Sequence, residues 1–198
     1  TMLLSAEHAL SMVKHLSALH SANPDPGLHF LLLGDYRDSL TGTLSSDDDI
    51  VSTAMAAIRA LREDTGHEFH YMQRERVYHA PDHIHMSRER KRGNLETLLK
   101  LVCGQSVEDG FTCFTVAPES LKGQYRYVIT LDSDTILPPG SALRMVGAML
   151  HPLRQRREIG GRMRGVSIVQ PRMEVAAHSV GSLLSLLLGW WSASKVMS

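Results

Sequence analysis

The strongest constraint on the fold is an apolar run, residues 127–131, that ends in Asp132, Ser133 and Asp134. Four of the five residues in the run are apolar, and they are largely β-branched or aromatic, which is typical of a buried strand in a parallel sheet. Side chains two residues apart in a strand point to the same side, and open α/β sheets bind ligands at the carboxyl ends of their strands. The sequence therefore predicts two carboxylates at one sheet edge.

Two neighbouring carboxylates are hard oxygen ligands of the kind that Mg²⁺ or Mn²⁺ prefers, and such ions usually share their coordination with substrate phosphates. The first interpretation is therefore a divalent cation that holds a diphosphate. The alternative is that Asp132 and Asp134 only begin a turn, since aspartate is common at that position.

Composition limits the classes of protein that remain. A chain of 198 residues with 43% hydrophobic content can form one sizeable core, so we expect a single domain over 1–198. Lys plus Arg and Asp plus Glu each total 21, which leaves no global field to attract nucleic acid. Cys103 and Cys113 lack the spacing of a metal site or a disulfide framework, and no signal peptide opens the sequence. These features predict cytoplasmic exposure.

The order of elements predicts an α/β fold with a mostly parallel, doubly wound sheet. Apolar side chains at helical spacing predict helices over 5–22, 46–63, 94–103 and 141–150. Short apolar runs predict strands over 28–33, 69–73, 111–116, 127–131 and 165–171. The Arg-, Glu- and His-rich stretch 74–93 reads as a long connection, and long ordered connections in compact domains are usually functional.

The stretch 180–191 is strongly apolar but too short to cross a bilayer, which takes about 20 residues. We expect the tail 180–198 to hold a core or interfacial helix. Trp190 and Trp191 suit either a membrane interface or packing against a segment outside this sequence.

Five blocks, in this order, resemble the glycosyltransferase domain of the cyclic β-1,2-glucan synthases, glycosyltransferase family 84. The blocks are Gly34-Asp35-Tyr-Arg-Asp38-Ser, Glu89-Arg-Lys-Arg-Gly-Asn94-Leu, Tyr127-Val-Ile-Thr-Leu-Asp-Ser-Asp-Thr-Ile-Leu-Pro138, His151-Pro-Leu153 and Gln170-Pro-Arg172. The resemblance implies a GT-A type, Rossmann-like sandwich that binds UDP-glucose with Mg²⁺ or Mn²⁺ and transfers glucose to a growing glucan. It also implies a larger parent chain embedded in a bacterial inner membrane, with this domain on the cytoplasmic side.

The resemblance also suggests roles for individual residues. We interpret Asp134 as the direct metal ligand and Asp132 as a ligand of the ribose or, through water, of the metal. The other roles are a uridine- and ribose-facing pair, Asp35 and Asp38; a diphosphate-facing group, Arg90, Lys91, Arg92 and Gly93; and an acceptor-side pair, Gln170 and Arg172. Each group also has a structural alternative. Asp35 and Asp38 could only form a turn that begins with aspartate, the basic group could be a solvated turn, and Gln170 and Arg172 could lie on an edge strand that Pro171 ends.

Two departures from the family pattern affect the expected activity. An apolar strand precedes the family segment that begins here with Thr1, and wider relatives carry an acidic base and a Gln-x-x-Arg-Trp motif that do not follow Gln170 here. We therefore expect a domain truncated at both ends that self-associates or is marginally stable, and that shows no transferase turnover alone. Two other functions stay open: a haloacid-dehalogenase-like phosphatase with Asp132 as nucleophile, and a non-catalytic nucleotide-binding or structural domain.

Overall fold

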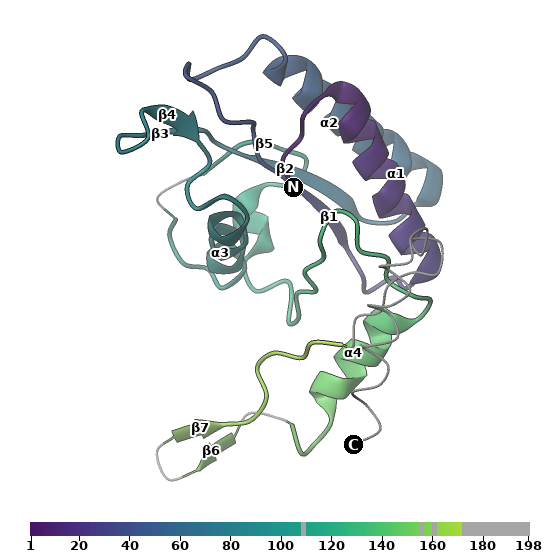
Figure 1. Cartoon of the computed structure of the whole chain (residues 1–198). Helices are drawn as coiled ribbons and strands as arrows, with labels where there is room; N and C mark the ends of the chain where they lie inside the picture. Colours follow the sequence, from purple (N-terminus) through teal and green to yellow (C-terminus); the bar gives the residue numbers. More distant parts are fainter. Residues whose placement is uncertain (108–109, 155–156, 160–161, 172–198) are drawn as a thin grey trace, which may run out of the picture. The chain divides into compact units, whose positions relative to one another are not determined.

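A computed structural model describes residues 1–107, 110–154, 157–159 and 162–171 (Figure 1). The chain divides into two compact units, Thr1–Arg144 and Met145–Ser198. Within the described residues, no helix combines the length and the apolar character needed to span a membrane. The expected tail helix over 180–198 lies outside the described residues.

A three-stranded sheet forms the centre of the first unit, in the order β1 (Phe30–Gly34), β2 (Phe69–Arg74) and β5 (Phe111–Phe114). Strands β1 and β2 are parallel, with Gly34 opposite Gln73. Strand β5 runs antiparallel to β2, with a register shift between Gln73 and Arg74. The predicted α/β class is confirmed, but the sheet is mixed rather than mostly parallel.

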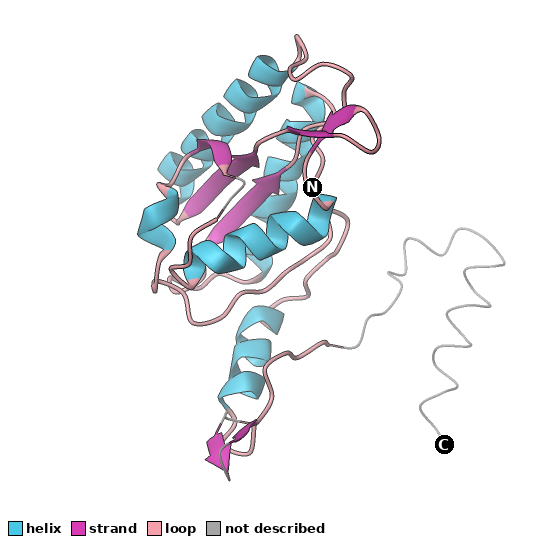
Figure 2. Cartoon of the chain, turned by 90° about the vertical axis from the view of Figure 1, so that its left-hand side faces the viewer, coloured by secondary structure: helices cyan, strands magenta, loops and turns pink. Residues whose placement is uncertain are grey.

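Three helices cover the two faces of this sheet. Helices α1 (Ala6–Ala22) and α2 (Asp47–Thr65) lie on one face, and α3 (Arg90–Val102) lies on the other (Figures 1 and 2). Helix α1 begins as predicted, because the side chain of Ser5 accepts a hydrogen bond from the His8 backbone N–H at 3.1 Å. Helix α2 ends at Gly66, whose φ of 67° is a left-handed conformation that glycine tolerates.

Strand β2 is buried along its whole length, so alternate side chains pack on opposite helical layers. Phe69 stacks on Phe30 and contacts His20 of α1. Met72 instead packs in an apolar cluster with Leu98 of α3 and Leu121 of the 3₁₀ helix η1 (Pro118–Leu121). Arg74 follows Met72 by two positions and faces the α3 side as well.

The connection between β2 and α3 contains a hairpin that the sequence did not predict. Strands β3 (Val77–His79) and β4 (Ile84–Met86) are antiparallel, and β4 is tied to the loop after β1 by reciprocal Ser39 and His85 backbone bonds of 2.9 and 2.7 Å. Helix α3 begins at Arg90, before the predicted start at Asn94. Glu89 takes the N-cap position, and Asn94 lies inside the helix.

Two predicted strands are wrong. Residues 127–131 alternate between half-buried and exposed side chains, the period of an extended chain, but no strand of the described residues includes them. Apolar and β-branched residues favour extended backbone, whereas a ladder also needs a hydrogen-bonding neighbour. Residues 165–171 likewise form no strand. Helix α4 (Ser141–Leu150) is confirmed, and the second unit adds an antiparallel hairpin, β6 (Arg157–Ile159) and β7 (Arg162–Arg164).

Candidate functional site

Polar side chains gather where the parallel strands β1 and β2 end. Asp35 and Asp38 come directly after β1, and Gln73 and Arg74 are the last residues of β2. The first turns of α3 lie at the same edge, because the Asn94 side-chain amide donates a hydrogen bond to the Gly34 carbonyl at 3.4 Å. The carboxyl ends of parallel strands are the usual ligand position in such sheets.

The two aspartates after β1 differ in burial and in partners. Asp35 is 5% exposed, and its Oδ1 atom has no hydrogen-bond partner within the described part of the chain. Asp38 forms an ion pair with Arg90, the first residue of α3, with 2.6 Å between the carboxylate oxygen and the guanidinium nitrogen. The Asp38–Arg90 pair therefore connects the loop after β1 to the start of α3.

Asp132 and Asp134 lie in a turn rather than at a strand end. The Thr135 backbone N–H donates to the Asp132 carbonyl at 3.1 Å, so the turn interpretation is correct for the backbone. Both aspartates are exposed, and the Asp132 carboxylate forms an ion pair with the Lys91 ammonium. This contact joins the Asp-Ser-Asp segment to the basic residues of α3.

The Asp132 and Asp134 carboxylates could bind a divalent cation, because they are oxygen donors and are accessible to solvent. Asp132 and Asp134 are hard oxygen donors open to solvent, which matches the preference of Mg²⁺ and Mn²⁺ for few protein ligands plus water and phosphate. Within the described ranges, no group of three or more His, Cys, Asp or Glu residues could hold a metal ion. A cation at this pair would therefore depend on ligands from water and substrate.

The four residues of the basic segment do not act as one group. Arg90 and Lys91 face the carboxylates through their ion pairs. Arg92 is 80% exposed and approaches Glu89 at 3.4 Å, so the structure does not bring it to the aspartates. Gly93 packs against the Arg74 guanidinium from β2.

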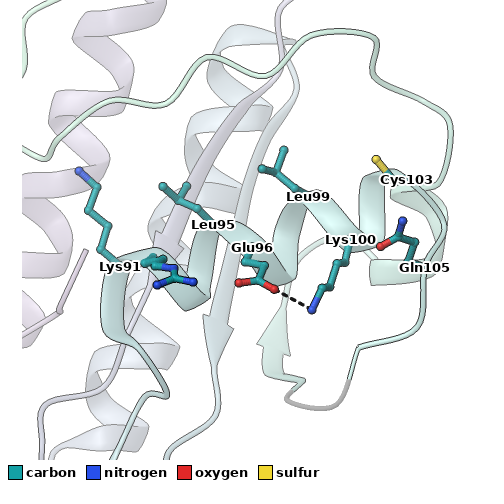
Figure 3. Close-up of a pocket in the computed structure, with 8 residues that line it drawn as sticks. Lys91, Leu95, Glu96, Leu99, Lys100, Cys103 and Gln105 are labelled. Carbon is teal, nitrogen blue, oxygen red and sulfur yellow. Dashed lines mark ion pairs between the residues drawn. The ribbon is translucent and has the colours of Figure 1, made fainter. Parts of the chain in front are cut away.

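A shallow hollow of about 740 Å³ follows the outer side of α3 (Figure 3). Leu95, Leu99 and Cys103 supply its apolar stripe, and Glu96 and Lys100 form an ion pair of 2.8 Å beside it. Lys91 lies at one end of the hollow, but none of the four candidate aspartates lines it. The candidate site is therefore the strand-end cluster and not this surface.

Asp35 and Lys91 also influence the Thr1 amino group beside the end of β1. Burial lowers the pKa of this group, the nearby Asp35 carboxylate opposes the change, and Lys91 adds to it. Asp35 and Lys91 therefore both act on the same position beside the end of β1. The carboxylates of the cluster can bind hydroxyl groups or a cation. Arg90 and Lys91 can donate hydrogen bonds to phosphate oxygens.

Three further polar residues belong to this edge, and their place there was not predicted. Gln73, Arg74 and Asn94 are 0%, 1% and 2% exposed, and each has one polar atom without a partner among the described residues, namely Gln73 Nε2, Arg74 Nε and Asn94 Oδ1. Their signal in the sequence is the Gln73-Arg74 pair at the end of an otherwise apolar strand. Gly34 leaves room for Gln73, because a Cβ there would collide with the Gln73 Oε1 atom.

The acceptor-side pair lies outside the first unit. Gln170 is exposed in the second unit, and Arg172 lies outside the described residues. Their role near the sugar or acceptor stays a prediction.

Comparison with known proteins supports the resemblance seen in the sequence. No family model matches the chain. The chain is 31% identical over 175 residues to the cyclic beta-(1,2)-glucan synthase NdvB of Rhizobium meliloti (strain 1021). The matched stretch covers 84% of this chain and 6% of that protein. The predicted relation to that enzyme is confirmed.

Proposed function

We propose that this chain, which is related to a short segment of a cyclic β-1,2-glucan synthase, is the donor-binding part of a glycosyltransferase. Its donor is UDP-glucose, and the product is β-1,2-glucan. The chain spans 6% of the length of the curated relative, so the complete transfer reaction is assigned to a longer protein that contains this segment.

The observation that carries the proposal is the meeting of three sequence blocks at one sheet edge. Asp35 and Asp38 follow β1, Arg90 and Lys91 begin α3, and Asp132 joins them through its ion pair with Lys91. These blocks are distant in sequence, and each is among those that resemble the family. Carboxylates beside paired cations at strand ends suit a ligand that has both hydroxyl groups and a diphosphate.

The chemistry follows from the charge that develops during glycosyl transfer. When the bond from glucose C1 to the diphosphate breaks, negative charge builds on the leaving UDP, and fixed cations lower the energy of that state. Arg90 and Lys91 would contact the diphosphate once their own carboxylate partners turn to the ligand. Asp35 and Asp38 would accept hydrogen bonds from uridine and ribose, as carboxylates do in dinucleotide folds.

Asp134 and Asp132 would hold the divalent cation, with Asp134 as the direct ligand. A bound Mg²⁺ or Mn²⁺ supplies Lewis-acid neutralisation of the diphosphate. Since Asp132 is paired with Lys91 in the free chain, a cation would have to displace Lys91 to use both carboxylates, and a phosphate that binds Lys91 would favour this.

The remaining parts of the proposal concern the parent enzyme. Its acceptor is the growing glucan, with Gln170 and Arg172 on the acceptor side. Its location is the bacterial inner membrane, with this segment on the cytoplasmic side. Both statements rest on the relation to the glucan synthase rather than on the strand-end cluster.

Thermal melting with and without UDP and Mn²⁺ tests the proposal. We expect UDP to raise the melting temperature only when Mn²⁺ or Mg²⁺ is present, because a cation shared by Asp134 and the diphosphate links the two ligands. Asp134→Ala should abolish the increase, whereas Asp64→Ala, an exposed aspartate of α2, should preserve it. Metal-independent stabilisation by UDP that survives Asp134→Ala would contradict the metal assignment.

A further inference from the structure

Arg74 is an unusual residue to find inside this sheet. It is 1% exposed and points to the α3 side of β2, where its guanidinium donates hydrogen bonds to the backbone carbonyls of Arg88 and Arg90, the latter at 3.2 Å. Burying a cation is costly unless its N–H groups donate hydrogen bonds. Here two of the guanidinium nitrogens donate to carbonyls of one short turn. The buried arginine therefore acts on the turn that starts α3.

That turn has a backbone conformation that needs support. Glu89 and Arg90 have φ values of 53° and 48°, in the left-handed region that side chains other than glycine disfavour. Consecutive residues keep such angles only where surrounding contacts over-determine them. The Arg74 guanidinium supplies contacts to the carbonyls on both sides of Glu89.

Gly93 shows how closely the guanidinium fits. A Cβ at this position would lie 2.8 and 3.0 Å from the two terminal nitrogens of Arg74 and would collide with the Arg88 carbonyl. The glycine is not required by its own backbone, since Gly93 is inside α3 and its φ is not positive. Glycine is therefore required here by the close approach of the Arg88 carbonyl and of the guanidinium that binds it.

The two side chains that leave this turn are the ones that meet the carboxylates. Arg90 reaches Asp38 and Lys91 reaches Asp132, so a change in the turn moves both cations together. We propose that Arg74 is a positioning residue of the donor site: it fixes the start of α3 so that Arg90 and Lys91 are presented to the diphosphate. The proposal rests on the proposed function, because it assigns Arg74 to that site.

Arginine suits this role better than lysine. A planar guanidinium can donate to two carbonyls at fixed angles, whereas an ammonium is a point donor on a flexible stem. Arg74→Lys should therefore restore part of what Arg74→Met removes. A purely charge-based role would instead give full rescue by lysine.

Hydrogen exchange and calorimetry together test the proposal. In the free chain, exchange at the Arg90 and Gly93 amides, which donate to Ser87 and Glu89 carbonyls, should speed up in Arg74→Met. With Mn²⁺ present, Arg74→Met should weaken UDP binding roughly tenfold, which is about 1.4 kcal/mol. The affinity for uridine, which lacks the diphosphate, should fall about twofold or less, because the larger loss for UDP comes from its phosphate contacts.

Two further variants keep the test decisive. Gly93→Ala should also weaken UDP selectively, because its methyl group collides with the Arg88 carbonyl that Arg74 binds. Arg74→Lys, with its partial rescue, carries the test if Arg74→Met does not fold. Ile58→Val, at a fully buried position of α2, is the control for a general loss of stability and should leave the UDP-to-uridine ratio unchanged.

The possible failures can be told apart. A wild-type chain that binds no UDP contradicts the proposed function. A wild-type chain that binds UDP, together with an Arg74→Met variant that keeps both this affinity and the slow exchange at Arg90 and Gly93, overturns the role of Arg74. Equal losses of UDP and uridine would also overturn it, because the arginine would then act on the whole fold.

Discussion

Replacing Lys91 with methionine should strengthen metal binding while it weakens nucleotide binding. In the free chain the Lys91 ammonium is paired with the Asp132 carboxylate, so a cation that binds the aspartates must displace it. The diphosphate instead uses Lys91 as a counter-charge. One substitution should therefore change the two affinities in opposite directions.

The size of the effect follows from the exposure of the pair. The Lys91 and Asp132 side chains are 59% and 56% exposed, and ion pairs in that range contribute at most about 1 kcal/mol. Removing the competing ammonium should therefore raise the affinity for Mn²⁺ alone by about fivefold or less. The loss for UDP should be larger, roughly tenfold or more, because a charged hydrogen bond to phosphate contributes about 1.5–3 kcal/mol.

Electron paramagnetic resonance of free Mn²⁺ can measure the metal affinity, and calorimetry can measure UDP. Lys100→Met is the matched control, because this lysine is in the same helix and forms its own ion pair with Glu96 at 2.8 Å. The gain in Mn²⁺ affinity should shrink at high salt, since exposed charges are screened. If Lys91→Met leaves Mn²⁺ binding unchanged or weaker, the competition inferred from the Lys91–Asp132 pair is wrong.

Three other outcomes test the fold that supports the site. Arg76→Met should cost about 3–5 kcal/mol in the free energy of unfolding, because it leaves the nearly buried Asp47 carboxylate, 2.7 Å from Arg76, without its cation. Urea titration measures this cost, and Arg62→Met, at a more accessible ion pair with Glu68, should cost about 1 kcal/mol or less. Burial lowers the pKa of His70, so the unfolded chain binds more protons as the pH falls below about 6.5 and stability should drop there; urea titrations from pH 8 to pH 5 should show this, with a smaller drop in His70→Gln. Ser5→Ala should cost about 1 kcal/mol through loss of the α1 cap, and an unchanged urea midpoint would contradict that cap.

Local sequence predicted most of the first unit because its elements have clear periods and ends. The apolar spacing of α1 and the Ser5 cap place that helix correctly, and the apolar run of β2 is enough to place a buried strand. Residues 127–131 show the limit of this reasoning. Their apolar character gives an extended chain with alternating burial, but whether a ladder forms depends on a neighbour that local sequence does not specify.

The start of α3 shows a second limit. A run of charged residues before Asn94 resembles a solvated loop, yet the helix begins at Arg90 because a guanidinium from β2 holds the preceding turn. Such a long-range contact is absent from local propensity. The sequence did indicate Asp38, Lys91 and Asp132 as site residues, but their pairing became visible only through the arrangement of β1 and α3.

We propose that UDP-glucose and a divalent cation bind together at the carboxylate and cation cluster beside β1. Nuclear magnetic resonance with Mn²⁺ tests this directly, because the paramagnetic ion broadens the amide signals of nearby residues. When Mn²⁺ and UDP-glucose are added together, we predict broadening centred on residues 132–135, with smaller effects at Asp35, Arg90 and Lys91. Broadening centred elsewhere in the chain, or signals at 132–135 that UDP-glucose does not change, would contradict the account.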